Sequence, residues 1–302
     1  MKTTFYGNGK LLLTSEYLVL DGAKALAIPT KYGQYLEVEK LSEKVLLWKS
    51  LDEHNRVWFD AIFKESHGVI ELLSEKNNLS ETLLFILQKT KKLNPTFLTE
   101  NHGFKITTKL NFSKNWGLGT SSTLISTIAA WAKVDAFTLL KNSFGGSGYD
   151  IACAIHDKPI LFSNNEHPPI IEEVVLPWDF KDELFFVYLN KKQDSKQAIG
   201  RYKNLNTNKK EAIVKVNALT QALISSKTLS AFENLLQEHE EILSNLLQLP
   251  KVKKAYFKDY PGIIKSLGAW GGDFVLATSK EALDYFPSKG YSVIIPFTTM
   301  LK

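Results

Sequence analysis

The sequence is poor in the residues that build several common kinds of site. It has one cysteine among its 302 residues, Cys153, so an intrachain disulfide bond is excluded. Zinc sites rich in cysteine are excluded for the same reason, and the six histidines show no metal-ligand spacing such as His-x-x-x-His. A single cysteine fits a reducing compartment, so we expect a cytoplasmic protein.

Long apolar runs and strong net charge are also missing. No apolar stretch approaches the roughly 20 residues that a membrane-spanning helix needs. The first residues, Met1-Lys-Thr-Thr-Phe, lack the apolar core of a signal peptide. The net charge is +5, and the lysines are spread along the chain. We therefore expect no membrane or nucleic-acid partner, because a small anionic substrate explains the modest basic balance as well.

The most informative stretch that the sequence does contain is a glycine loop. Residues 117–122 read Gly-Leu-Gly-Thr-Ser-Ser, and apolar residues at helical spacing follow as far as Ala132. Alternation from Phe104 to Phe112 predicts a strand just upstream. Glycine lets the backbone approach a ligand closely, and a helix N-terminus offers free N–H groups to an anion. This order favours a phosphate-binding loop; the alternative is an ordinary glycine turn.

The rest of the chain predicts a mixed α and β protein. Its hydrophobic content of 44% and charged content of 23% are typical of a globular protein. The second half predicts the order strand, helix, helix, strand, helix, strand, and His239 falls on an apolar helix face as a core residue. Further expectations are a short buried strand at 18–20, an antiparallel meander with core aromatic residues at 35–63, a helix at 80–93 capped by Asn78 or Ser80, and helices at 209–225 and 228–248.

Four glycine-bearing segments, in this order, resemble the motifs of one family. They are Gly9-Lys10 through Glu16-Tyr17, Gly117 to Ser121, Ser147-Gly148-Tyr149-Asp150, and Lys265 through Gly268-Ala-Trp-Gly-Gly-Asp273. Together they resemble the GHMP small-molecule kinases, which include galactokinase, homoserine kinase, mevalonate kinase and phosphomevalonate kinase. The resemblance covers essentially the whole chain. It implies a two-domain α+β fold, with a ribosomal-protein-S5-like α/β domain at 1–170 and a ferredoxin-like α+β domain at 171–302.

The resemblance also implies a role for each motif. Asp150 is expected to hold the acceptor hydroxyl or take its proton, and Lys10 to keep Asp150 ionised and stabilise the transferring phosphoryl group. ATP is expected on the backbone N–H groups of Gly117, Leu118, Gly119, Thr120, Ser121 and Ser122, with the Thr120 hydroxyl on Mg²⁺. The residues expected to bind substrate are Glu16, Ser147, Gly148, Lys192, Ser195, Gly271, Gly272 and Asp273.

Each role has a plainer alternative, and the chain departs from the family in places. Asp150 is alternatively an acid at a helix N-terminus, Lys10 a solvated lysine, and Glu16 a support for its turn. The family's third-motif glycine is replaced by Trp270, and a family proline is replaced by Ser113. The family's glutamate that helps to hold Mg²⁺ is missing, because no Glu occurs between 101 and 165.

The resemblance implies an ATP-dependent kinase for a small anionic metabolite. Glu16-Tyr17, Gly146 to Asp150 and Gly271 to Asp273 resemble phosphomevalonate kinase more than galactokinase. Phosphomevalonate is therefore the first expected acceptor and mevalonate the second, in isoprenoid precursor synthesis. The alternatives are a homoserine or sugar kinase, a decarboxylase of a phosphorylated intermediate, and a GHMP-fold protein that binds a ligand without catalysis. A monomer or a homodimer is expected.

Overall fold

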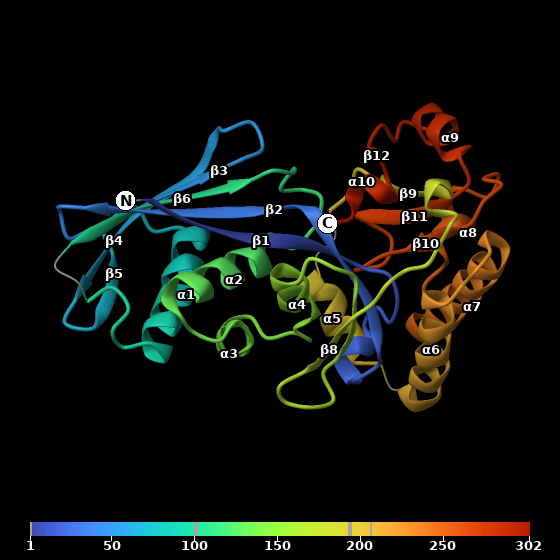
Figure 1. Cartoon of the computed structure of the whole chain (residues 1–302), viewed down its shortest axis with the longest axis horizontal. Helices are drawn as coiled ribbons and strands as arrows, with labels where there is room; N and C mark the ends of the chain where they lie inside the picture. Colours follow the sequence, from blue (N-terminus) through green and yellow to red (C-terminus); the bar gives the residue numbers. More distant parts are fainter. Residues whose placement is uncertain (1, 100–101, 193–194, 206) are drawn as a thin grey trace. The chain divides into compact units, whose positions relative to one another are not determined.

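The computed structural model describes residues 2–99, 102–192, 195–205 and 207–302 (Figure 1). The chain divides into two compact units, and neither unit is one continuous run of residues. The first consists of Met1–Gly9, Tyr32–Lys114 and Leu118–Ile155, and the second of Lys10–Lys31, Asn115–Gly117 and His156–Lys302. The strands β1 (Lys2–Leu12) and β2 (Ala25–Leu41) therefore contribute to both units. The expected division between residues 170 and 171 stays a prediction.

The sheet of the first unit has the strand order β5-β4-β3-β6-β2. Its other strands are β3 (Leu46–Leu51), β4 (Val57–Ser66), β5 (Val69–Leu72) and β6 (Gly103–Leu110). β3 pairs antiparallel with β4 but parallel with β6, which separates it from β2. The expected antiparallel meander over 35–63 is therefore wrong in one pairing. Local alternation predicts that a stretch is a strand, whereas its neighbour is chosen by long-range packing.

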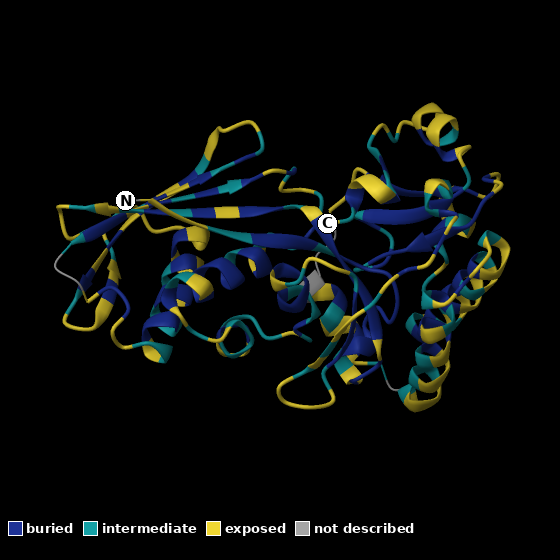
Figure 2. Cartoon of the chain, in the orientation of Figure 1, coloured by how far each residue is buried: buried dark blue, intermediate teal, exposed yellow. Residues whose placement is uncertain are grey.

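Helices cover one face of this sheet (Figure 1). They are α1 (Asn78–Leu93), α2 (Thr120–Ala132), α3 (Ala136–Ser143) and α4 (Tyr149–Ile155). Buried side chains of the sheet and of α1 and α2 form one hydrophobic cluster that includes Trp48, Phe63, Ile106 and Ile125. Figure 2 shows the buried residues concentrated on the strands and on α2. The predicted strand before the glycine loop and the predicted helix after it are both confirmed.

Helix α1 begins at Asn78, two residues before the predicted start at residue 80. Its N-cap is Asn77, whose side chain accepts hydrogen bonds from the N–H groups of Leu79 and Ser80. The Ser80 hydroxyl accepts in return from the Asn77 N–H at 2.8 Å, which completes a capping box. The expected caps, Asn78 and Ser80, are therefore corrected to Asn77, with Ser80 as its partner inside the helix.

The second unit contains two groups of strands. β7 (Ile160–Ser163) pairs with the first residues of β2 and with β8 (Ile170–Glu173). An antiparallel sheet has the order β10-β11-β9-β12. Its strands are β9 (Leu184–Tyr188), β10 (Ile264–Ser266), β11 (Phe274–Thr278) and β12 (Ile294–Pro296). The stretch expected as a strand at 18–20 is instead a 3-10 helix, Leu18–Asp21, that ends at Gly22 with φ +89°.

The long helices of the second unit are an antiparallel pair (Figure 1). They are α6 (Lys209–Ile224) and α7 (Leu229–Leu247), which confirms both predicted helices. The helices α5 (Ser195–Lys203), α8 (Val252–Tyr256), α9 (Ala282–Ser288) and α10 (Phe297–Met300) and a 3-10 turn at Lys181–Glu183 complete the unit. The expected α+β class is confirmed. Within the described residues, no helix combines the length and apolarity needed to cross a membrane.

Candidate active site

The glycine loop leads into a helix that has no capping side chain. Gly117 has φ +67° and Gly119, the N-cap of α2, has φ +93°. Every residue of α2 is described, and its N-cap makes no side-chain hydrogen bond. The Ser122 hydroxyl turns back to donate to the Gly119 carbonyl at 2.8 Å, while Ser121 is exposed. The helix start thus keeps backbone N–H groups available to an anion, as the sequence predicts.

Lys10 lies directly on this loop. It is near the end of β1, and its ammonium donates to the carbonyl of Gly117 at 2.9 Å. The side chain is half-buried. A positive charge is therefore held at the first residue of the glycine loop, where it favours a phosphate group. The expected proximity of Lys10 to Asp150 joins residues of different units and stays a prediction.

Asp150 is the second residue of α4. Its carboxylate accepts from the N–H of Ile151 at 3.1 Å, and the side chain is half-buried. Gly148, with φ +93°, is buried just before the helix, and Ser147 is half-buried. Because α2 and α4 pack together in the first unit, the structure joins the second half of the glycine loop and the Asp150 segment in one body.

The last glycine motif also reaches the loop, through Asp273. A methyl group on Gly117 would lie 2.4 Å from the Asp273 carboxylate, so that carboxylate lies directly against the Gly117 backbone. The Asp273 N–H donates to the Lys191 carbonyl at 2.7 Å, which joins the motif to the expected substrate segment. Lys192 is exposed. The structure therefore brings Lys10, Gly117, Asp273 and Lys191 together within the second unit.

The other residues expected to bind substrate differ in how far they are buried. Gly271 has φ +82° and is half-buried, and Gly272 is buried. Ser195 begins α5, but its side chain lies outside the described residues. Their contacts with a substrate stay predictions.

Trp270 stands where the family motif has glycine. Its side chain is 6% exposed, and it packs in a hydrophobic cluster with Tyr17 and Tyr202. The indole N–H donates to the Pro250 carbonyl at 3.1 Å, which joins the motif to the segment that follows α7. The backbone keeps the left-handed conformation, with φ +41°. The indole therefore belongs to the core of the second unit, while the backbone keeps a shape that suits glycine.

Glu16 is part of a buried ion pair. It is 1% exposed, and Lys265 of β10, itself fully buried, donates to its carboxylate at 2.5 Å. Glu240 of α7 lies 3.4 Å from the same ammonium and accepts from the Ser266 N–H at 3.1 Å. The first and last glycine motifs are therefore joined by a buried charge cluster. A direct contact between Glu16 and a substrate stays a prediction.

His239 completes this cluster. It is fully buried, which confirms its predicted place in the core, and its Nε2 accepts from the Ser15 N–H at 3.0 Å. Among the described residues, its Nδ1 atom has no hydrogen-bond partner. Ser15 has φ +66°, at the position where the family motif has glycine. The histidine thus holds a left-handed turn beside Glu16.

Burial controls the protonation of these groups. It raises the pKa of Glu240 to about 7, against the opposing attraction of Lys265. It raises the pKa of Glu16 as well, and holds the pKa of His239 well below its usual range.

The sequence analysis missed Glu240 and the pairing of Lys265. The available signal is a lysine between apolar residues in Gly262-Ile-Ile-Lys265-Ser, because a buried lysine needs a carboxylate partner.

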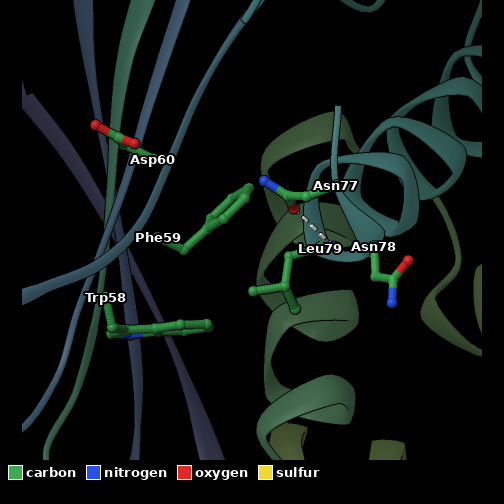
Figure 3. A pocket seen from close by; sticks show the side chains of 6 residues that line it. All are labelled: Trp58, Phe59, Asp60, Asn77, Asn78 and Leu79. Carbon is green, nitrogen blue, oxygen red and sulfur yellow. Dashed lines mark hydrogen bonds between the residues drawn. The ribbon is translucent and has the colours of Figure 1, made fainter. Parts of the chain in front are cut away.

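An open hollow of about 530 Å³ lies between β4 and the start of α1 (Figure 3). Ser50 pairs with Phe59 and Leu51 with Val57, so Trp58 is the extra residue of a β-bulge. A bulge redirects a side chain, and Trp58 and Phe59 both face the hollow while Asp60 points away (Figure 3). The Lys114 ammonium lies 5.5 Å from the centre of the Trp58 ring. Trp48, Phe59 and Phe63 are buried, as expected for the aromatic residues in 35–63, and Trp58 is half-buried against the same core. Tyr35 is the exception, with 38% of its surface exposed.

Comparisons with known proteins find similarity in structure rather than in sequence. No protein-family model matches the chain, and no curated protein matches its sequence. Among solved structures, the mevalonate kinase of Methanococcus jannaschii is 15% identical with a TM-score of 0.67, over 96% of this chain and 94% of that one. The galactokinase of Lactococcus lactis, solved with galactose, is 12% identical with a TM-score of 0.70, over 98% and 94%.

A third solved structure includes a nucleotide analogue. The phosphomevalonate kinase of Streptococcus pneumoniae, in complex with phosphomevalonate and AMPPNP, is 18% identical with a TM-score of 0.65, and 95% of each chain is covered. Identities this low establish shared architecture, and the coverage extends along nearly the whole chain. The protein therefore shares the α+β fold of these solved mevalonate kinase, galactokinase and phosphomevalonate kinase structures.

Proposed function

We propose that the protein is an ATP-dependent kinase that phosphorylates a small anionic metabolite. The observation that carries this proposal is the uncapped start of α2, which follows a glycine loop whose first carbonyl holds the Lys10 ammonium. Backbone N–H groups and a lysine are the groups that bind and neutralise transferring phosphates. The similar fold of a phosphomevalonate kinase solved with AMPPNP supports ATP as the phosphoryl donor.

Each polar group has a separate task in this proposal. The N–H groups at residues 117–122 bind the ATP phosphates, and Lys10 offsets the charge that builds up on the transferred group. Asp150 orients the acceptor hydroxyl and takes its proton. The buried ion pairs of Lys265 with Glu16 and Glu240 hold the first motif against the last.

The residues present fit a magnesium ion that arrives with the nucleotide. Within the part of the chain that the structure describes, no group of three or more His, Cys, Asp or Glu side chains gathers as a metal site. Mg²⁺ commonly uses one or two protein oxygens and completes its shell with phosphate oxygens and water. The Thr120 hydroxyl, in the first turn of α2, is one such oxygen. When bound, the ion supplies positive charge to the phosphate oxygens.

Phosphomevalonate is the first proposed acceptor, and mevalonate is the second. The exposed Lys192 follows Lys191, whose carbonyl accepts from the backbone N–H of Asp273, so two consecutive lysines, with their positive charge, are joined through one backbone hydrogen bond to the residue that reaches the glycine loop. Such charge suits an acceptor that carries a carboxylate or phosphate. Homoserine and sugars remain alternative acceptors, and the galactokinase of similar fold was solved with galactose.

The test is ADP release from Mg-ATP by the purified protein. Mevalonate, phosphomevalonate, homoserine and galactose are offered in parallel, and Asp150→Asn is assayed beside the wild type. We expect turnover with one acceptor and a loss of at least about a hundredfold in kcat for Asp150→Asn. AMPPNP binding by calorimetry should be nearly unchanged in that variant, because Asp150 acts on the acceptor.

Three outcomes would contradict the proposal. Tight AMPPNP binding without turnover on any of the four acceptors would favour a ligand-binding protein of the same fold. Release of CO₂ together with ADP from a phosphorylated mevalonate would favour the decarboxylase alternative. A wild-type protein that binds no nucleotide would remove the basis of the phosphate-loop assignment.

A further inference from the structure

Asp273 is fixed against the first residue of the glycine loop. Both Asp273 carboxylate oxygens lie within 2.7 Å of the position that a Gly117 methyl group would take. The backbone of Asp273 is held on both sides, because its N–H donates to Lys191 and its carbonyl accepts from the Leu189 N–H at 2.8 Å. The next residue, Phe274, pairs with Tyr188 in the sheet. The carboxylate is therefore placed by the β9–β11 pairing.

The surroundings of Asp273 carry charge of both signs. The Tyr188 hydroxyl donates to the Asn115 carbonyl at 3.1 Å, two residues before Gly117. Burial, and then the negative charge of Asp273, raise the pKa of Tyr188. Lys10 brings one ammonium to the Gly117 carbonyl. A carboxylate and an ammonium therefore share the first residue of the loop.

A carboxylate at this place conflicts with a bare triphosphate. ATP brings several negative charges, and the Asp273 carboxylate repels them wherever they approach the first residue of the loop. A divalent cation between the carboxylate and the phosphates turns the repulsion into attraction. The chain has no glutamate between 101 and 165, so the glutamate that the family resemblance implies for the cation is missing from this stretch. Asp273 is an oxygen donor of the kind that Mg²⁺ prefers.

We propose that Asp273 supplies the protein carboxylate of a divalent-cation site that nucleotide phosphates complete at the glycine loop. This inference rests on the proposed function, because the nucleotide provides the remaining oxygen ligands. It assigns to the last glycine motif a task in metal–nucleotide recognition. It also explains why Gly117 has no side chain, since a methyl group there would displace the carboxylate.

The test compares AMPPNP affinity with Mg²⁺ and with EDTA by calorimetry. The variants are Asp273→Asn and, as a matched control, Asp284→Asn, which changes an exposed aspartate of the same unit. Asparagine tolerates the left-handed backbone that Asp273 adopts, with φ +49°. We expect Mg²⁺ to strengthen binding at least about tenfold in the wild type and the control. In Asp273→Asn the ratio should fall below about threefold, with metal-free AMPPNP bound more tightly than by the wild type.

A second variant tests the same site through a gain of metal binding and not through a loss. Asp273→Cys offers a thiolate, which prefers Cd²⁺ to Mg²⁺, and the native Cys153 is buried. We expect Cd²⁺, and not Mg²⁺, to strengthen AMPPNP binding to this variant. A full Mg²⁺ effect in Asp273→Asn, or no Cd²⁺ effect in Asp273→Cys, would overturn the inference and leave nucleotide binding intact. A wild type that binds AMPPNP under neither condition would instead overturn the proposed function, and the inference with it.

Discussion

At the scale of single residues, two glycines share a backbone conformation but differ in their surroundings. Gly117 has φ +67° and Gly145 has φ +66°. A methyl group on Gly117 would meet the Asp273 carboxylate at 2.4 Å, whereas one on Gly145 would meet none of the described residues within 4 Å. Gly117 is therefore required both for its torsion and for the close approach of Asp273. Gly145 is required for its torsion alone.

This pair allows a matched test of the glycine loop. Gly117→Ala and Gly145→Ala should each lose about 1–2 kcal/mol of unfolding free energy, because alanine resists the left-handed conformation. Gly117→Ala should lose about 1–3 kcal/mol more, since Asp273 must move. AMPPNP affinity should fall at least about tenfold in Gly117→Ala and stay near wild type in Gly145→Ala. Urea unfolding and calorimetry measure both effects, and equal losses in the two variants would contradict the assigned contact.

Trp270 tests the balance between strain and packing. Trp270→Gly restores the family residue and relieves about 1 kcal/mol of backbone strain at φ +41°. It also removes a buried indole, which costs about 3–5 kcal/mol. We expect a net loss of about 2–4 kcal/mol in urea unfolding. Trp270→Phe, which keeps a ring but loses the bond to Pro250, should lose less. A stabilised Trp270→Gly would show that strain dominates.

At the scale of elements, helix α7 supports the site through β10. Glu240 accepts from the backbone and hydroxyl of Ser266, and His239 accepts from Ser15. Lys265 lies between Glu240 and Glu16, so the two carboxylates share one ammonium. When both carboxylates are ionised, Glu16, Glu240 and Lys265 together carry a net charge of −1. Burial raises the pKa of Glu240, and the nearby charge of Glu16 raises it further.

The raised pKa predicts a pH-dependent difference between the wild type and Glu240→Gln. Because the folded pKa of about 7 lies above the unfolded value, Glu240 stabilises the fold most below about pH 4.5 and loses this contribution as the pH rises through 7. Glutamine keeps a hydrogen-bond acceptor for Ser266 and does not titrate. The stability of Glu240→Gln relative to the wild type should therefore rise by about 3 kcal/mol between pH 4.5 and 8.

Urea unfolding over this pH range measures the difference. Comparison of the two proteins cancels the opposite contribution of His239, whose pKa is lowered by burial in both. Glu241→Gln is a suitable control, because Glu241 is exposed on the same helix and pairs with Lys251. A pH-independent difference between the wild type and Glu240→Gln would contradict the assigned burial of an ionisable carboxylate.

At the scale of the whole molecule, nucleotide binding should stabilise the folded chain. A ligand at about a hundred times its Kd adds about 2.7 kcal/mol to the unfolding free energy if it binds only the native state. We expect Mg-AMPPNP to raise the Tm of the wild type and of Asp150→Asn by several degrees. Gly117→Ala should show little shift at the same concentration. Thermal unfolding measures these shifts, and an unchanged wild-type Tm would oppose nucleotide binding.

The sequence by itself determined the long helices, the strand before the glycine loop and the positions of the motifs. The strand before the glycine loop, the helix that begins at Thr120, and the helices α6 and α7 follow from local periodicity and glycine placement. Such signals are carried by neighbouring residues, so a single sequence displays them. The α+β class follows from the same element order, and four motifs in sequence pointed to the fold that the solved structures share.

Only the tertiary structure decided which distant residues meet. The insertion of β6 between β2 and β3, the Asp273 carboxylate at Gly117, and the pairing of Lys265 with Glu16 and Glu240 join positions far apart in the chain. Trp270 likewise adopts a left-handed backbone conformation that suits glycine, while its side chain packs in the core. The local sequence pattern does not show this combination. These contacts depend on burial and strand pairing across the folded chain, because periodicity describes what one segment forms and not what it packs against.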